Sequence, residues 1–235
     1  MNLWQSILAD RMAHDVPQYA ALKAWHLFRL GHANDIAGGG NLHPATLVGG
    51  PVLDGALGLP LDGATQYARL GNAADLSPGA GDMTVYLRFS TVAAAGTTYL
   101  WSKYGTTGTH IVSLRIGATG GMTGALRGSA NRLVTLLYLT PPNVALNNGA
   151  WHTAAVVKSG TDFKLYVDGA LAHAVSDALF GSLLLDNAAE PWAVGAFKAF
   201  GGAYSFWFPG NIATRLQWNV ALAPAEIATA HAGGY

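Results

Sequence analysis

Alternating apolar and polar residues between positions 151 and 169 form the clearest pattern in the chain. Residues 151–157 alternate with the period of two that is typical of a β-strand, and residues 163–167 do the same. Residues 158–162 supply a turn between the two runs. Asp168-Gly169 then supplies residues that tolerate positive φ in a two-residue hairpin turn. The pattern predicts antiparallel β-structure.

Short apolar-rich runs separated by Gly, Pro and Asn predict the other strands. We expect them at residues 24–30, 56–61, 66–70, 83–90, 99–103, 111–116, 124–128, 133–139, 171–175, 183–185, 192–196, 205–208 and 212–218. A final helical turn is expected to start at residues 224–227. Many short strands with turn residues between them favour an antiparallel sandwich over βαβ units. Thirty glycines and ten prolines match the number of turns that such a fold needs.

The N-terminal segment has a different period. Its apolar residues have a helical spacing that gives the helix one apolar face, formed by Leu3, Trp4, Ile7 and Leu8. We therefore expect a short helical arm over residues 1–23, followed by one domain over residues 24–235. Two interpretations stay open: the arm packs on its own domain, or it docks on a partner protein.

Composition narrows the classes of partner. The 235 residues include no cysteine, only 11% are charged, and the formal net charge is zero. Such a surface has no basic footprint for nucleic acid or anionic lipid, and no apolar run approaches the ~20 residues of a membrane span. The first fifteen residues lack the basic and apolar regions of a signal peptide, so we expect folding and assembly in the cytoplasm.

Four segments carry a family resemblance. Residues 46–63 are similar to the pattern G-T-L-x-G-G-P … A-L-x-F-D-G, and residues 82–103 to F-T-V-x-x-W-V … I-V-S-K. Residues 151–169 resemble W-H-H-V-A-V … L-Y-V-D-G, and residues 208–227 resemble F-x-G-x-I-D-x-V-R-I-Y-N-R-A-L-S-x-x-E-I. In order and spacing the chain resembles concanavalin A-like lectin domains of the laminin G type. The resemblance implies an all-β fold, a two-sheet antiparallel jelly-roll sandwich, here with the N-terminal helical extension.

The resemblance says little about function, because this fold serves lectins, enzymes and structural proteins alike. The chain departs from the family pattern at Ala213 and Thr214, where relatives have an acidic residue after the isoleucine. Calcium sites in relatives are built from loop carboxylates, so the resemblance carries over no calcium site.

The sequence contains few of the residue patterns that catalysis needs. Glycosidases need two carboxyl groups flanking the scissile bond, whereas this chain has only two glutamates, Glu190 and Glu226, and no strand with two acids on one face. His26, His32 and His43 form a zinc site only if the fold brings them together. We expect no catalytic residue, no metal and no cofactor.

Aromatic residues are the remaining candidates for binding. Residues 197–208 hold six aromatic side chains around a Gly-Gly turn. Three roles stay open for this segment: core packing, a protein contact, and stacking on a glycan. The candidate partner-binding residues are Leu3, Trp4, Ile7 and Leu8 of the arm and Phe200, Tyr204, Phe206 and Trp207 of this segment.

The sequence therefore favours a structural protein over an enzyme. Our first interpretation is a virion component, a capsid decoration (cement) protein of the kind found in bacteriophages, assembled in the host cytoplasm. Its partners would be the major capsid protein or other shell subunits, together with further copies of itself. The alternative is a carbohydrate-binding module, phage-borne for attachment to host glycans.

Overall fold

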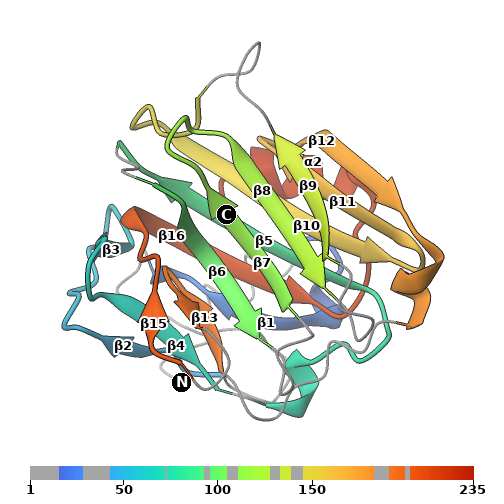
Figure 1. The fold of residues 1–235 in the computed structure, drawn as a ribbon, viewed down its shortest axis with the longest axis horizontal. Coiled ribbons are helices and arrows are strands. Elements are labelled where there is room, and N and C mark those ends of the chain that lie inside the picture. Colours follow the sequence, from blue (N-terminus) through green and yellow to red (C-terminus); the bar gives the residue numbers. More distant parts are fainter. Residues whose placement is uncertain are drawn as a thin grey trace.

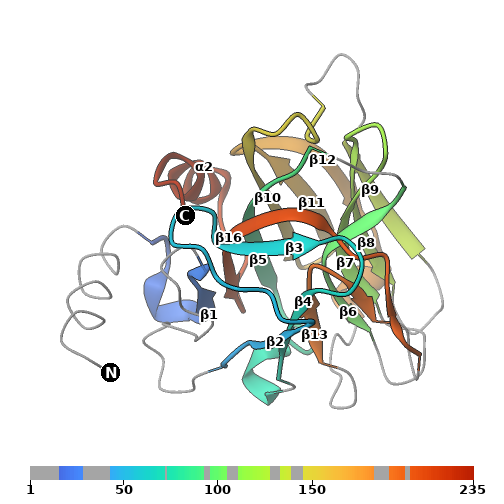
Figure 2. The same ribbon diagram turned by 90° about the vertical axis from the view of Figure 1, so that its left-hand side faces the viewer.

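Two antiparallel β-sheets face each other in the computed structural model (Figures 1 and 2). The structure describes residues 16–28, 43–71, 73–92, 96–104, 111–127, 133–138, 145–182, 191–198 and 202–235. Among these residues the fold is the all-β sandwich that the sequence predicts.

The first sheet is built around the longest strand. Its order is β1 (Leu22–His26), β16 (Pro209–Trp218), β5 (Met83–Ser90), β10 (Trp151–Ser159), β11 (Asp162–Val167) and β12 (Ala170–Ser176), and β3 (Leu59–Asp62) pairs with the first part of β16. The turn between β11 and β12 holds Asp168 and Gly169 at φ values of 47° and 76°. This confirms the hairpin that the alternating pattern predicts.

The second sheet covers the first. Its order is β2 (Thr46–Val48), β4 (Tyr67–Leu70), β13 (Trp192–Val194), β6 (Thr98–Tyr104), β7 (Ile111–Ile116), β8 (Met122–Arg127) and β9 (Leu133–Tyr138). A short hairpin of β14 (Phe197–Lys198) and β15 (Tyr204–Ser205) lies beside it. Short 3-10 helices occur at Tyr19–Ala21, Ala74–Leu76 and Ala178–Ser182.

The main core lies between the sheets. Every second residue of β5 (Met83, Val85, Leu87 and Phe89) is buried there. Trp101 of β6 and Trp192 of β13 enter from the other sheet, with ring centroids 5.4 Å apart. Full burial of a large apolar side chain stabilises the fold by about 1.5–3 kcal/mol, so these alternating positions specify which face of each strand turns inward.

A second core lies on the outer face of the first sheet. Tyr86 and Trp218 point to this side and pack with Ile227 and Ala230 of the helix α2 (Pro224–Ala232). Figure 2 shows α2 on the face of this sheet that is turned away from the second sheet. β5 is therefore buried on both faces, which explains why its intervening residues Thr84 and Tyr86 are buried too.

The α-helix of the described residues, α2, is C-terminal. The sequence predicts only a helical turn there, at residues 224–227, and places its helical extension at the N-terminus. The predicted N-terminal helix falls mainly on residues 1–15, which lie outside the described residues. The described part of the segment contains the 3-10 helix Tyr19–Ala21 and the buried Val16. Trp218 Nε1 donates a hydrogen bond to Pro17 O at 2.9 Å, so this part is attached to the sandwich.

Several predicted strand limits also change. β1 ends at His26 rather than at residue 30, and β3 begins at Leu59 rather than at residue 56. Gly58, just before β3, has φ of 88° and lies against the backbone of Ile212, so it turns the chain into the strand. The strand β2 lies in a stretch for which the sequence pattern predicts no strand. The predicted strand at 183–185 lies outside the described residues.

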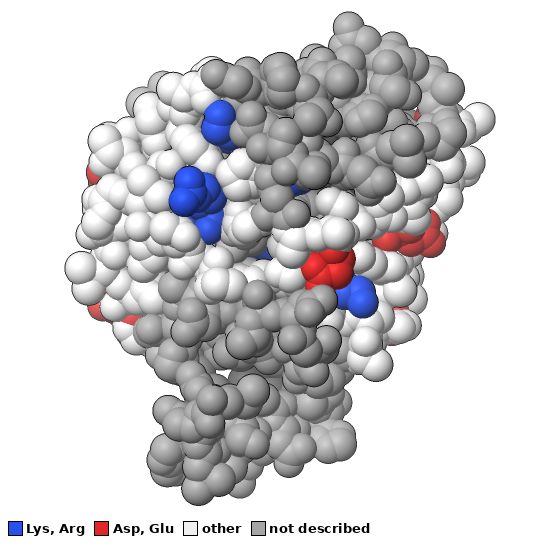
Figure 3. Space-filling model, turned by 90° about the horizontal axis from the view of Figure 1, so that it is seen from below, with Lys and Arg blue, Asp and Glu red and all other residues white. Residues whose placement is uncertain are grey.

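The described surface carries few charges. Figure 3 shows a face on which Lys, Arg, Asp and Glu side chains are sparse and scattered. Within the described ranges, no helix has the length and apolar character needed to cross a membrane.

Candidate functional site

The β14–β15 hairpin holds much of the aromatic segment that the sequence singles out. It is attached to β6 by hydrogen bonds: Ser102 Oγ donates to Ala196 O at 3.0 Å, and Gly195 N donates to Leu100 O at 2.8 Å. Tyr99 N donates to Phe206 O at 3.0 Å on the other side of the hairpin. The hairpin is therefore supported by a strand in the middle of the second sheet.

Three aromatic rings meet at this attachment. The centroid of the Tyr99 ring lies 4.6 Å from that of Phe197 and 5.9 Å from that of Phe206, and the Phe197 and Phe206 centroids lie 6.1 Å apart. Tyr99 is buried and Phe197 is half-buried, whereas 53% of Phe206 is exposed. We call these three residues the aromatic platform.

Phe206 owes its position to an unusual backbone conformation. Its φ is 52°, in the left-handed region that costs a bulky L-residue of the order of 1 kcal/mol or more. Regular alternation would place its ring on the same side as Tyr204, two residues earlier. The left-handed turn places it instead against Phe197 and Tyr99. It also ends β15 at Ser205, which corrects the predicted strand over residues 205–208.

The other side of the hairpin is also aromatic. Tyr204 stacks on Tyr67 of β4 with ring centroids 4.1 Å apart, and Lys198 Nζ lies 5.5 Å from the centroid of the Tyr204 ring. Lys198 Nζ also donates to Gly202 O within the hairpin connection. These contacts brace the hairpin and hold Tyr204 in a partly buried position.

One cation borders the aromatic platform. Arg115 of β7 pairs directly with Tyr99 of β6, and its Nη1 atom donates to the Tyr99 hydroxyl at 3.4 Å. Leu114 and Ile116 on either side of it point into the core, so the Arg115 side chain lies on the outer face of the sheet. The platform and Arg115 form the candidate site.

The predicted site residues have different outcomes. Tyr204, Phe206 and Trp207 lie together at the hairpin, and only Phe206 is largely exposed. Trp207 is half-buried, and its Nε1 atom is buried without a hydrogen-bond partner among the described residues. Phe200 and the arm residues Leu3, Trp4, Ile7 and Leu8 lie outside the described residues. Whether any of these residues binds a partner stays a prediction.

Sequence reasoning missed Tyr99 and Arg115 as site residues. Both belong to predicted strands, and neither has a local signal that separates it from other strand residues. The hairpin follows them by about eighty residues or more in the chain, and only the sheet pairing brings them beside it.

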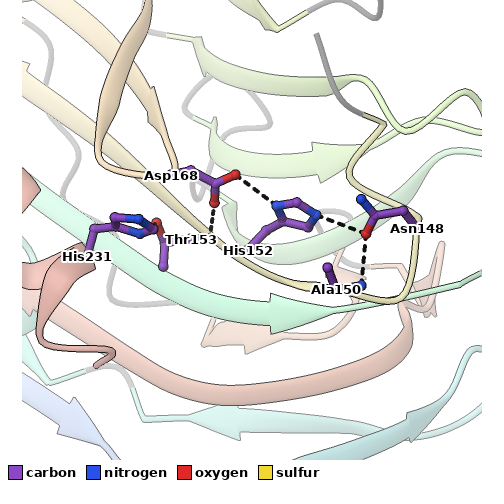
Figure 4. A network of polar contacts seen from close by, with 6 residues as sticks. All are labelled: Asn148, Ala150, His152, Thr153, Asp168 and His231. Atoms are coloured by element: carbon purple, nitrogen blue, oxygen red, sulfur yellow. Dashed lines mark hydrogen bonds and ion pairs between the residues drawn. The ribbon is translucent and has the colours of Figure 1, made fainter.

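Apart from the candidate site, a cluster of polar residues lies at the start of β10 (Figure 4). His152 Nδ1 lies 2.8 Å from Asp168 Oδ2, and His152 Nε2 lies 3.1 Å from Asn148 Oδ1. Asp168 Oδ1 accepts from Thr153 N at 2.9 Å, while the Thr153 hydroxyl lies 2.9 Å from His231 Nδ1 of α2. The cluster links β10, the β11–β12 turn and the C-terminal helix.

This cluster does not have the order of a catalytic triad. The hydroxyl of Thr153 contacts His231, whereas the carboxylate contacts His152, so no hydroxyl–imidazole–carboxylate chain is formed. Burial opposes ionisation of Asp168, but the hydrogen bonds from His152 and Thr153 outweigh it and lower the pKa of this carboxyl below its ordinary value. We interpret the cluster as a structural clamp.

Asp62 lies in another Asp-Gly turn, and its carboxylate also has a structural role. Its Oδ1 atom accepts from the backbone N–H groups of residues 64, 65 and 66, and its Oδ2 atom accepts from the Thr65 hydroxyl. Partial desolvation opposes these bonds, yet together they lower the pKa of Asp62 to about 2. The carboxylate is therefore occupied by its own loop.

The fold brings together two of the three histidines considered for a zinc site, His26 and His43. His26 Nε2 lies 2.7 Å from His43 O, and His43 Nε2 lies 3.1 Å from Asp75 Oδ2. His26 thus contacts the backbone of His43 rather than a shared metal position, and His32 lies outside the described residues. Over the described ranges, no group of three or more His, Asp or Glu side chains is arranged to hold a metal ion.

Two facing antiparallel sheets with this strand order define a lectin-type β-sandwich. The chain belongs to the concanavalin A-like lectin/glucanases superfamily, whose laminin G type model matches residues 62–228. This confirms the resemblance seen in the sequence motifs. No curated protein sequence matches the chain.

Solved structures share the fold at low sequence identity. The CBM40 module of the Ruminococcus gnavus IT-sialidase is 18% identical with a TM-score of 0.55, over 66% of this chain and 84% of that one. Botulinum neurotoxin type C is 12% identical with a TM-score of 0.69, over 94% of this chain and 53% of that one. The binding domain of Paraclostridial Mosquitocidal Protein 1 is 12% identical with a TM-score of 0.63, over 92% and 53%. This chain therefore spans about half of the two toxin chains, and these likenesses show the fold alone.

Proposed function

We propose that this protein is a non-enzymatic, lectin-like binding protein that holds a glycan on the aromatic platform. The observation that carries the proposal is Phe206, an aromatic ring that is largely exposed and is held there by a left-handed backbone. Backbone strain of this kind persists where the surrounding structure imposes it, and it concentrates at functional sites.

The platform suits the chemistry of sugars. The flat apolar face of an aromatic ring covers the C–H groups on one face of a pyranose, while polar groups at the rim bind its hydroxyls. Phe197 and Tyr99 both contact the Phe206 ring. The Tyr99 hydroxyl and Arg115 supply polar groups at the border of the platform.

The comparisons support a binding role of this class. The Ruminococcus gnavus module is described as bound to α2,3- and α2,6-sialyllactose. Cell entry of botulinum neurotoxin type C is described as dependent on two ganglioside molecules. Both statements concern those proteins. For this chain they support a carbohydrate-binding role over the capsid decoration role.

A glycan array followed by calorimetric titration tests the proposal. Phe206→Ala removes the exposed ring and is expected to weaken glycan binding at least about tenfold. Leu171→Ala is the matched control, because Leu171 is exposed to a similar extent (54%) but lies on β12 of the other sheet. Its affinity is expected to equal that of the wild type.

Two outcomes would contradict the proposal. One is a wild-type protein that binds no glycan on the array. The other is a bound glycan whose affinity is the same for Phe206→Ala as for the wild type, since the sugar would then lie elsewhere.

Capsid decoration is the second candidate function, with the virion as its location. The observation that favours it is a set of exposed aliphatic residues, Val52 and Val92 at 79% each, which a neighbouring protein would cover and a sugar would not. The native mass of the assembly tests this role. A particle-bound protein supports it, whereas a free monomer contradicts it.

A further inference from the structure

Arg115 combines partial exposure with few interactions. Its guanidinium group has five N–H donors, and toward the described residues only Nη1 makes a hydrogen bond, to the Tyr99 hydroxyl at the long distance of 3.4 Å. None of the ion pairs between described residues involves Arg115. By contrast, Lys164 lies 3.0 Å from Asp162, and Lys158 donates to two backbone carbonyls.

The position of Arg115 relative to the platform sets the shape of a ligand. Tyr99 connects the two: its ring contacts Phe197 and Phe206, and its hydroxyl end contacts Arg115. Tyr99 therefore contacts both the stacking ring and the cation. Thr123 of β8 pairs directly with Arg115 on its other side, so the neighbouring strand adds a hydroxyl rather than a competing carboxylate.

We infer that the ligand is an acidic glycan, in which a carboxylate or sulfate group pairs with Arg115 while a sugar ring stacks on Phe206. The inference rests on the proposed function and specifies its ligand class. A planar guanidinium binds such oxyanions through two parallel hydrogen bonds, and these charge-assisted bonds are stronger than neutral ones. Arg115 is thus a specificity-determining residue that separates acidic from neutral sugars.

General electrostatics does not explain such a preference. The chain has a formal net charge of zero, and its charged residues are few. A long-range attraction of anions is therefore weak and is screened by physiological salt. A preference for acidic sugars would have to come from a local contact.

The test compares three probes: α2,3-sialyllactose, which carries a carboxylate, 3′-sulfated lactose, and neutral lactose. Each is titrated into the wild type and into Arg115→Gln, Arg115→Lys and Lys23→Gln. Lys23→Gln is the matched control, because it removes one positive charge from β1 of the other sheet. Thermal unfolding of each variant checks that the fold is retained.

We expect the wild type to bind at least one acidic probe about tenfold more tightly than lactose, which corresponds to one charge-assisted contact. Arg115→Gln should lose this preference, so that it binds the acidic probes no more tightly than lactose. Arg115→Lys should keep part of the preference, and Lys23→Gln all of it. If Arg115→Gln loses the preference for only one of the two acidic probes, the anionic group of that probe is the one that pairs with Arg115.

Equal binding of the three probes by the wild type would overturn the inference and leave the proposed function intact. A preference for acidic probes over lactose that survives in Arg115→Gln would also overturn the inference without affecting the proposed function. If the wild type binds none of the three probes while Phe206-dependent binding of another neutral glycan is found, the acidic ligand class is wrong. If no glycan binds at all, both proposals fail.

Discussion

His152 Nδ1 lies 2.8 Å from Asp168 Oδ2, and this contact joins the start of β10 to the turn between β11 and β12. The same carboxylate accepts from Thr153 N, and Thr153 in turn contacts His231 of the C-terminal helix. One turn residue therefore serves two purposes: its backbone adopts the left-handed conformation of the turn, and its side chain binds two residues of β10, one of which contacts the C-terminal helix.

Asp168→Asn tests the second purpose. Asparagine tolerates the left-handed conformation, so the turn is retained, but it has one acceptor oxygen where the carboxylate has two. We expect the free energy of unfolding to fall by about 1–3 kcal/mol, because His152 and Thr153, which are both buried, no longer have one acceptor oxygen each. Thermal and denaturant unfolding measure it. Asp162→Asn should change stability less, because its carboxylate contacts Ser176, which is exposed, and Lys164, which is only partly buried; an equal effect of both substitutions would contradict the clamp.

The buried His26 predicts a loss of stability in mild acid. Burial, assisted by the charge of Arg215, lowers the pKa of His26 from 6.5 to about 3. Below pH 6.5 the unfolded chain takes up a proton at this residue that the folded chain does not. The contribution of neutral His26 to the free energy of unfolding is therefore complete above pH 6.5. It is lost as the pH falls towards 3, by up to about 1.4 kcal/mol per pH unit.

His26→Gln is the variant that checks this dependence. Its amide can donate to His43 O as His26 Nε2 does, but it does not titrate. Denaturant unfolding between pH 7 and pH 4 should show a shallower loss of stability in the variant than in the wild type. Parallel curves for the two proteins would show that His26 is not responsible.

The left-handed backbone at Phe206 predicts opposite effects on folding and binding. Phe206→Gly removes the strain of positive φ, whereas Phe206→Ala keeps most of it. We expect the glycine variant to be more stable than the alanine variant by roughly 1 kcal/mol, while both lose the glycan contact. Unfolding curves measured beside the titrations check this. A glycine variant that is less stable than the alanine variant would contradict a strained backbone.

Gly58 predicts a strong effect of added side-chain volume. Its φ is 88°, and a Cβ atom there would overlap the backbone of Ile212 and Ala213 in β16. Gly58→Ala is therefore expected to destabilise the fold by about 3 kcal/mol or more, because backbone atoms cannot give way. Gly50→Ala is the control: its φ is 75°, but a Cβ atom meets nothing within 4 Å. Equal melting temperatures of the two variants would contradict this explanation.

Most of the architecture could be predicted from the sequence. Period-two alternation in β5, β10 and β11 identifies these segments as strands, and Asp168-Gly169 reports on a backbone conformation that few residues adopt. These signals are local, so they survive without knowledge of the partner strands. The four family-like segments add the two-sheet jelly-roll sandwich.

The candidate site depended on the tertiary structure. The aromatic segment was visible as composition, but alternation alone could not tell which ring is exposed, since the left-handed turn at Phe206 reverses the direction that alternation predicts. Tyr99 and Arg115 reach the site through sheet pairing and through the path of the β14–β15 hairpin. The sequence by itself determined the scaffold, because burial leaves a periodic trace in the chain; a surface assembled from distant strands leaves none, so only the fold decided it.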